Sequence, residues 1–214
     1  MATQNNMDLT QGKPFSVLLK FAIPVILGNL FQLFYTLADS VIVGKTMGAE
    51  ALAAVGSTSI IIYFIFCFIN GFTGGFGICL GQRFGARDQK GMTKSIAVSA
   101  VLCVLFTIIL TAVCCLLAHP ILRWMQIPAD IYDGAYTYMF IVLAGTGATI
   151  YYNMISNMLR ALGDSKTPLY FLVFSSLLNI VLDVVFILPL QMGVAGAALA
   201  TILAQLLSAV LSNI

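Results

Sequence analysis

Six long apolar segments constrain the fold of this chain more than any other feature of its sequence. They extend over about residues 15–43, 51–80, 95–118, 136–159, 169–188 and 194–214. A helix needs about 20 apolar residues to cross the hydrocarbon core of a bilayer, and each segment meets that requirement. Only 8% of the 214 residues are charged, whereas soluble domains carry about a quarter. The sequence therefore predicts an all-α, polytopic membrane protein, a bundle of six transmembrane helices.

Basic residues alternate between the two ends of these segments. The N-terminal region and the second and fourth connections carry eight of the ten Lys and Arg residues, namely Lys13, Lys20, Arg83, Arg87, Lys90, Lys94, Arg160 and Lys166. Because basic connections stay in the cytoplasm, we expect both termini on that side. The protein is then a multi-pass component of the plasma or inner membrane, in contact with lipid.

Composition argues against several other classes of protein. A net charge of +2 is too small to indicate a nucleic-acid partner. The five cysteines all lie in apolar segments and show no metal-type spacing, so we expect them to be reduced and structural. His119 is the only histidine, and neither a Ser–His nor an HExxH arrangement accompanies it. We therefore expect no enzymatic activity and no cofactor.

Two acidic residues, Asp39 and Asp183, interrupt apolar segments. A mid-span aspartate costs about 2.5–3.5 kcal/mol on insertion scales, so such residues usually face protein or water and are functional. Asn179 lies four residues before Asp183 and shares its helix face. Thr201 lies at a similar depth, given a rise of about 1.5 Å per residue. The alternative is that an aspartate near a span end simply reaches the interface, and Asn179 makes that reading weaker for Asp183.

These four residues predict a cation site. Carboxylate, amide and hydroxyl oxygens suit a hard cation such as Na⁺. Two carboxylates close together in a medium of low dielectric also suit a proton. The pattern leaves the choice between Na⁺ and H⁺ open.

Other polar residues are candidates for the lining of a cavity. Asn29, Gln32 and Thr36 share a helix face with Asp39, which predicts a polar stripe toward the bundle interior. Pro24 removes a backbone hydrogen bond and predicts a bend, with a plain packing kink as the alternative. In the fourth segment, Tyr152, Asn153, Met154 and Asn157 could contact a flat organic cation, or they could be packing residues.

Several stretches carry a family resemblance. They are Pro24 with Asp39, LGQRFGARDQKGM (residues 80–92), RALGDSKTP (160–168), LNIVLDVVF (178–186) and MGVAGAALAT (192–201). In these the chain resembles the N-terminal half of a multidrug and toxic compound extrusion (MATE) transporter, over almost its full length. The resemblance implies that residues 1–214 form one six-helix lobe. It also implies cation-coupled export of amphipathic organic cations by alternating access.

The resemblance assigns residues and partners as well. It puts the cation site of the lobe on Asp39, Asn179, Asp183 and Thr201, and the bending proline on Pro24. It implies a second, C-terminal lobe, in the same polypeptide or in a second chain. A flippase for lipid-linked precursors and a non-transporting half-lobe are the alternatives. A flippase favours a basic cavity, and we expect no Lys or Arg in this interior.

Overall fold

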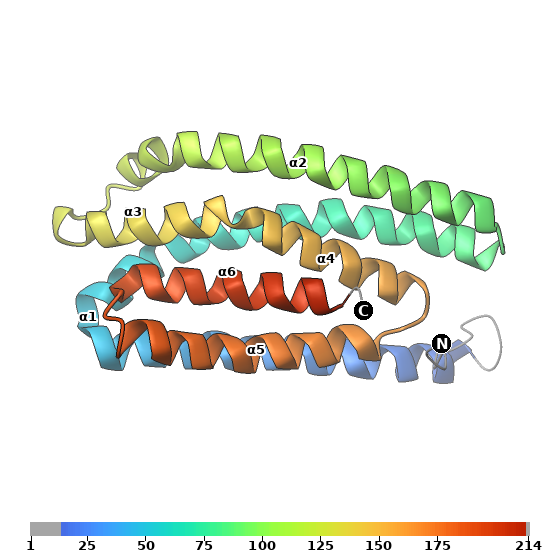
Figure 1. Cartoon of the computed structure of the whole chain (residues 1–214), viewed down its shortest axis with the longest axis horizontal. Coiled ribbons are helices and arrows are strands. Elements are labelled where there is room, and N and C mark those ends of the chain that lie inside the picture. The colour runs from blue at the N-terminus through green and yellow to red at the C-terminus, as the bar shows by residue number, and fades with distance from the viewer. Residues whose placement is uncertain (1–13, 213–214) are drawn as a thin grey trace.

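The computed structural model describes residues 14–212, and every element within them is a helix. The helices are α1 (Pro14–Gly85), α2 (Gln89–Trp124), α3 (Ala129–Ala144), α4 (Thr146–Ala161), α5 (Lys166–Ile187) and α6 (Gly193–Leu211). They lie side by side in one elongated bundle, with the α1–α2 and α4–α5 turns at one end and the α2–α3 and α5–α6 turns at the other (Figure 1). The predicted all-helical fold class is confirmed.

The first connection is much tighter than its sequence suggests. Helix α1 is 72 residues long and contains the first two predicted segments, and its torsion angles leave the helical range at Gly48, with φ 88° and ψ −175°. Only glycine adopts this conformation readily. The two halves of α1 then run in opposite directions with no intervening loop (Figure 1). Pro24 lies inside the first half, where the torsion angles stay helical.

The fourth predicted segment forms two helices instead of one. Helices α3 and α4 are bent by 45° at a short break. Gly145 occupies the break, and a Cβ atom there would collide with the side chain of Ile202 on α6. Helices α1, α2, α5 and α6 are each long and apolar enough to cross a membrane, and the bent pair would be a fifth such unit. The exact bounds of the six segments stay a prediction.

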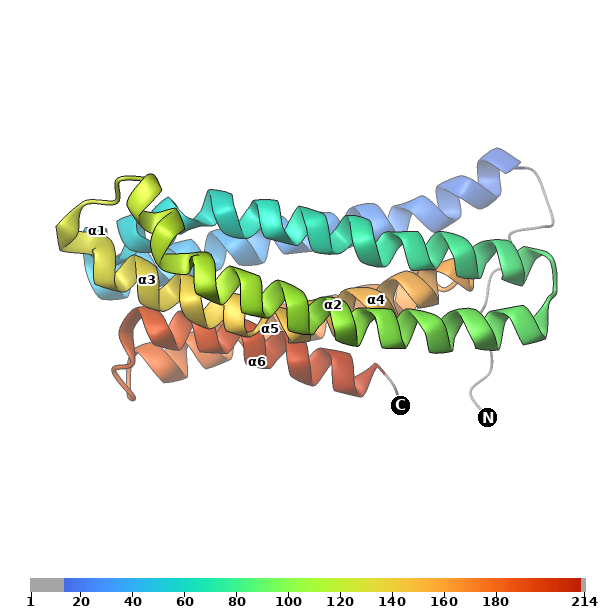
Figure 2. The ribbon, with the colours of Figure 1, turned by 90° about the horizontal axis from the view of Figure 1, so that it is seen from above.

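The apolar core lies where the second half of α1 meets α2, α3 and α4. Its buried members include Ile69, Leu122, Met139 and Leu143. Helix α2 otherwise exposes long apolar side chains, such as Leu116, at the surface. The N-terminal end of α1 diverges from α5 and α6 (Figure 2). These three helices and α4 surround the polar part of the molecule.

An ordered cap closes the turn between α1 and α2. The Gly91 amide donates to Asp88 Oδ1 over 2.9 Å, and Arg83 Nη1 lies 2.9 Å from Asp88 Oδ2. These two contacts, first the amide and then the guanidinium, lower the pKa of the Asp88 carboxyl group. A Cβ atom at Gly91 would collide with the Asp88 carboxylate, so a glycine is needed for the close approach.

Candidate functional site

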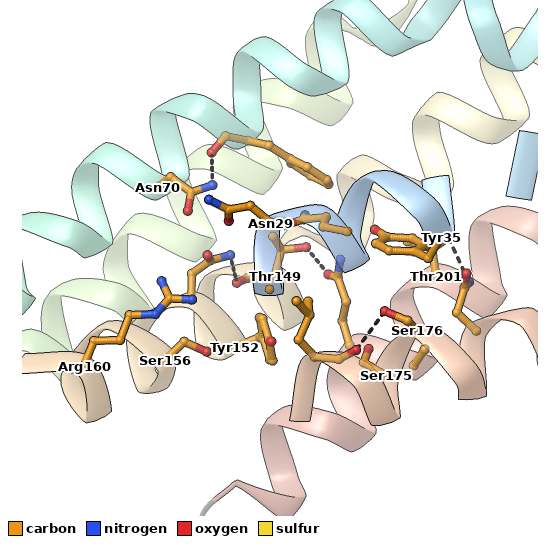
Figure 3. A pocket seen from close by; sticks show the side chains of 18 residues that line it. Asn29, Tyr35, Asn70, Thr149, Tyr152, Ser156, Arg160, Ser175, Ser176 and Thr201 are labelled. Carbon is orange, nitrogen blue, oxygen red and sulfur yellow. Dashed lines mark hydrogen bonds between the residues drawn. The ribbon is translucent and has the colours of Figure 1, made fainter. Parts of the chain in front are cut away.

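A cavity of about 120 Å³ lies between α1, α4, α5 and α6. Its wall is mostly polar, and each of the four helices contributes to it (Figure 3). From α1 come Asn29, Gln32, Tyr35 and Asn70. The cavity is therefore a polar chamber inside a bundle whose outer surface is apolar.

Helix α4 supplies one long wall of this chamber. Thr149, Tyr152, Asn153, Ser156 and Arg160 line it, and their spacing places them on one helix face. The hydroxyl of Thr149 donates to Gln205 Oε1 on α6 over 2.6 Å. The amide of Asn153 donates to the backbone carbonyl of Thr149 over 2.8 Å. The first of these hydrogen bonds joins the α4 wall to α6, and the second lies within α4.

Helices α5 and α6 supply the opposite side, and Thr201 lies at one end of the chamber (Figure 3) with Asn179 as its hydrogen-bond partner. Asn179 is 2% exposed. Its Nδ2 lies 3.4 Å from Thr201 Oγ1, and the Thr201 hydroxyl donates to the Ala197 carbonyl over 3.1 Å. The amide nitrogen of Asn179 thus points to α6, and its carbonyl oxygen is left free.

Asp39 and Asp183 lie directly beyond that end. Each follows a lining residue by four positions, Tyr35 on α1 and Asn179 on α5, which is about one helical turn. The two carboxyl groups are close enough to interact electrostatically. Two carboxylates cannot hydrogen-bond each other, because neither has a proton to donate. Asp183 is 0% exposed and Asp39 is half-buried.

This group of residues holds four buried oxygen atoms that receive no hydrogen bond. They are Asp39 Oδ1, Asn179 Oδ1, Asp183 Oδ1 and Asp183 Oδ2. Leaving a buried acceptor without a donor costs about 1–3 kcal/mol. All four are acceptors, so a cation or a proton would satisfy them, whereas an anion would not. We call these three residues together with Thr201 the acceptor cluster.

Four of the seven predicted lining residues line the chamber, namely Asn29, Gln32, Tyr152 and Asn153. The other three lie elsewhere. The Thr36 hydroxyl donates to the Gln32 carbonyl over 2.9 Å on an exposed part of α1. Met154 is buried in the apolar core. Asn157 donates to Thr73 Oγ1 over 3.1 Å. The polar stripe of α1 therefore faces the chamber only in part, since Thr36 has turned away from it.

The structure also corrects one expectation about charge. Arg160 lines the chamber, although we expected no basic residue in the interior. Helix α4 continues to Ala161, so Arg160 belongs to the helix and not to the following loop. Arg160 follows Thr149 by eleven residues, which is about three helical turns. This spacing in the sequence could have placed it on the polar face of α4. Beside the chamber, Tyr138 contacts both buried apolar clusters and lies within electrostatic range of Asp39 and Asp183.

Comparison with known proteins gives consistent matches. Residues 24–185 match the MatE family model. "Probable multidrug resistance protein YpnP" of Bacillus subtilis is 39% identical over 198 residues, which is 92% of this chain and 44% of that protein. "Probable multidrug resistance protein YoeA" of the same organism is 28% identical over 190 residues, 87% of this chain and 41% of that protein.

The fold has a close match among solved structures. A MOP superfamily transporter from Pyrococcus furiosus superposes with a TM-score of 0.91 at 30% sequence identity, covering 99% of this chain and 47% of that one. The chain thus spans less than half the length of the proteins that it matches.

Proposed function

This chain belongs to the MatE family, and we propose that it forms the N-terminal lobe of a cation-coupled antiporter. Its substrates would be amphipathic organic cations, exported by alternating access. The names of the multidrug resistance relatives support the export of drugs, without indicating their charge. The second lobe, in the same polypeptide or in a second chain, would complete the chamber.

The acceptor cluster is the observation that carries the proposal. Its two carboxylates come from different helices, and within residues 14–212 neither forms an ion pair. A buried negative charge that lacks a counter-ion favours uptake of Na⁺ or H⁺. We assign the cluster as the coupling-ion site, with Na⁺ and H⁺ as alternatives, and we assign no cofactor.

Coupling follows from the short distance between the cluster and the chamber. One helical turn separates Asn179, which lines the chamber, from Asp183. Two unit charges about 6 Å apart interact by about 3 kcal/mol at an effective dielectric constant of about 20. A coupling cation in the cluster and an organic cation in the chamber would therefore weaken each other's binding. Mutual exclusion of this kind is what antiport requires.

A lipid-linked precursor flippase is the second candidate. Arg160 gives the chamber one of the basic groups that such a flippase would use to hold a phosphate. The acceptor cluster still favours cation coupling, because its unsatisfied atoms are all acceptors. We propose an orientation with the N-terminus in the cytoplasm of the plasma or inner membrane, from the distribution of basic residues.

Calorimetric titration of the purified chain with Na⁺ at several pH values tests the coupling site. We expect Na⁺ or proton binding to fall by at least about tenfold in Asp183→Asn, because one charged ligand is lost. Competition between Na⁺ and protons in the wild type would identify one shared site. Asp130→Asn, on an exposed part of α3, changes the charge equally and should leave binding intact. Unaltered Na⁺ and proton binding in Asp183→Asn would contradict the proposal.

A further inference from the structure

The end of the chamber opposite the acceptor cluster carries a positive charge and hydrogen-bond donors, where the cluster carries negative charge and acceptors. Arg160 lies at one end and Thr201 at the other (Figure 3). Arg160 is eleven residues after Thr149 on α4, a rise of about 16 Å. Thr149 in turn bonds Gln205, one turn after Thr201 on α6. The guanidinium and the acceptor cluster are therefore separated by nearly the whole length of the cavity.

The Arg160 end is rich in hydrogen-bond donors. Arg160 is half-buried, and its Nε atom is buried without a hydrogen-bond partner. Ser156, one turn earlier, is 5% exposed. Tyr152, one turn before Ser156, lines the same part of the chamber and lies within electrostatic range of Arg160. Two hydroxyl groups and a guanidinium thus point to the same part of the chamber.

No anion compensates this charge among the described residues. The lining of the chamber includes no Asp or Glu, and Arg160 forms no ion pair within residues 14–212. A guanidinium is always charged in proteins, and its planar set of donors matches a carboxylate or a phosphate. A buried Nε without a partner therefore indicates a binding position for an anionic oxygen group.

We propose that the Arg160 end is a subsite for the carboxylate of a zwitterionic amphipathic substrate, whose cationic group lies near the acceptor cluster. This inference rests on the proposed transport of organic cations and adds a second charged group to the substrate. Arg160 and Ser156 bind the carboxylate, and Asp39 with Asp183 attracts the cation. The length of the chamber then selects substrates with well-separated charges.

A pair of rhodamine dyes tests the subsite. One dye carries a carboxylate at the end of a long alkyl chain and is a zwitterion with well-separated charges, and the other is the methyl ester of that chain and only cationic. Only the chain with its carboxylate has to enter the Arg160 end. Binding to the purified, delipidated chain is measured by fluorescence polarisation for the wild type and three variants. Arg160→Gln removes the charge, Arg160→Lys keeps it without the planar donors, and Lys166→Gln removes an exposed charge near the same end of α4.

We expect the wild type to prefer the free acid. Arg160→Gln should weaken binding of the free acid by about 10- to 100-fold, the usual range for a lost charge-assisted hydrogen bond. It should leave ester binding unchanged, which also shows that the variant is folded. Arg160→Lys should recover part of the loss, and Lys166→Gln should resemble the wild type.

Other outcomes would overturn the inference. Equal binding of the two dyes by the wild type, or equal loss of both in Arg160→Gln, would give Arg160 a structural role only. Loss of the free-acid preference on adding phosphatidylglycerol would assign the subsite to a lipid phosphate. None of these three results would contradict the proposed transport function. Failure of either dye to bind the wild type would instead contradict the proposed function as well.

Discussion

The apolar core and the polar chamber are built partly from the same helix, yet they satisfy their polar groups differently. In and beside the core, buried hydroxyls donate to carbonyls of their own helix, as Thr73 does to Ile69 and Thr146 to Leu143, over 2.8 and 2.9 Å. At the chamber, Asp39 and Asp183 hold buried oxygens without donors. Satisfied polar atoms accompany structural packing here, and unsatisfied ones accompany the candidate binding site.

The largest effect on cation binding should come from neutralising the two carboxylates of the acceptor cluster. We expect Asp39→Asn and Asp183→Asn each to remove most Na⁺ or proton binding. The double variant should bind the cation no more weakly than the single variant with the lower affinity. The reason is that the two groups act on one ion, so their effects are not additive. Calorimetric titration of the four proteins gives the coupling energy. Independent, additive losses would show that the carboxylates do not share a site.

The same substitutions should leave the folded bundle intact. Neutralising a carboxylate removes a buried acceptor that has no donor and does not create a cavity. Denaturation in detergent should therefore give a free energy of unfolding no lower than that of the wild type. A marked loss of stability in Asp183→Asn would place that carboxylate among the structural polar groups.

A core substitution should give the opposite result. Leu143 is 0% exposed, so Leu143→Ala should lower the free energy of unfolding by about 2–5 kcal/mol through the cavity it leaves. The affinity for Na⁺ or protons should not change in the fraction that remains folded. Leu116→Ala, at a side chain that is 78% exposed, is the matched control and should have little effect. Loss of cation affinity in Leu143→Ala would show that the two regions are not separable.

The smallest effect should come from the turn between α1 and α2. The amide of Gly91 and then Arg83 lower the pKa of Asp88. The resulting stabilisation of the folded state is fully present at a pH above the usual pKa of a carboxyl group. It is lost as the pH falls through the lowered pKa of Asp88. Asp88→Asn should reduce the melting temperature slightly at neutral pH and show no difference from the wild type in acid. A difference that persists in acid would mean that Asp88 stabilises by some means other than its charge.

The fold and the acceptor cluster could be predicted because both follow from distances along single helices. Apolar length indicated the membrane bundle, and a fixed rise per residue put Asp39, Asp183 and Thr201 at one depth. In the structure Asn179 lies beside Thr201, and Asp39 and Asp183 are close enough to interact. Their role in binding a cation stays a prediction.

The remaining features depend on neighbours distant in sequence. The break at Gly145 accommodates Ile202 of α6, a contact that no local pattern contains. Thr36 and Tyr138 have faces that could be assigned only once the adjoining helices were in place. Arg160 was missed for another reason, because α4 continues past its apolar segment. The side that a residue presents is thus harder to predict than its depth.

The reversal at Gly48 has a mechanical consequence for Asp39. That aspartate is nine residues before Gly48, within about 14 Å along a continuous helix. Since the two halves of α1 join without a loop, there is no slack at this corner to absorb a displacement. A tilt of the first half of α1 therefore requires either a change in the torsion angles of Gly48 or a movement of the second half. Asp39 belongs to a short rigid segment whose only hinge toward the second half is Gly48.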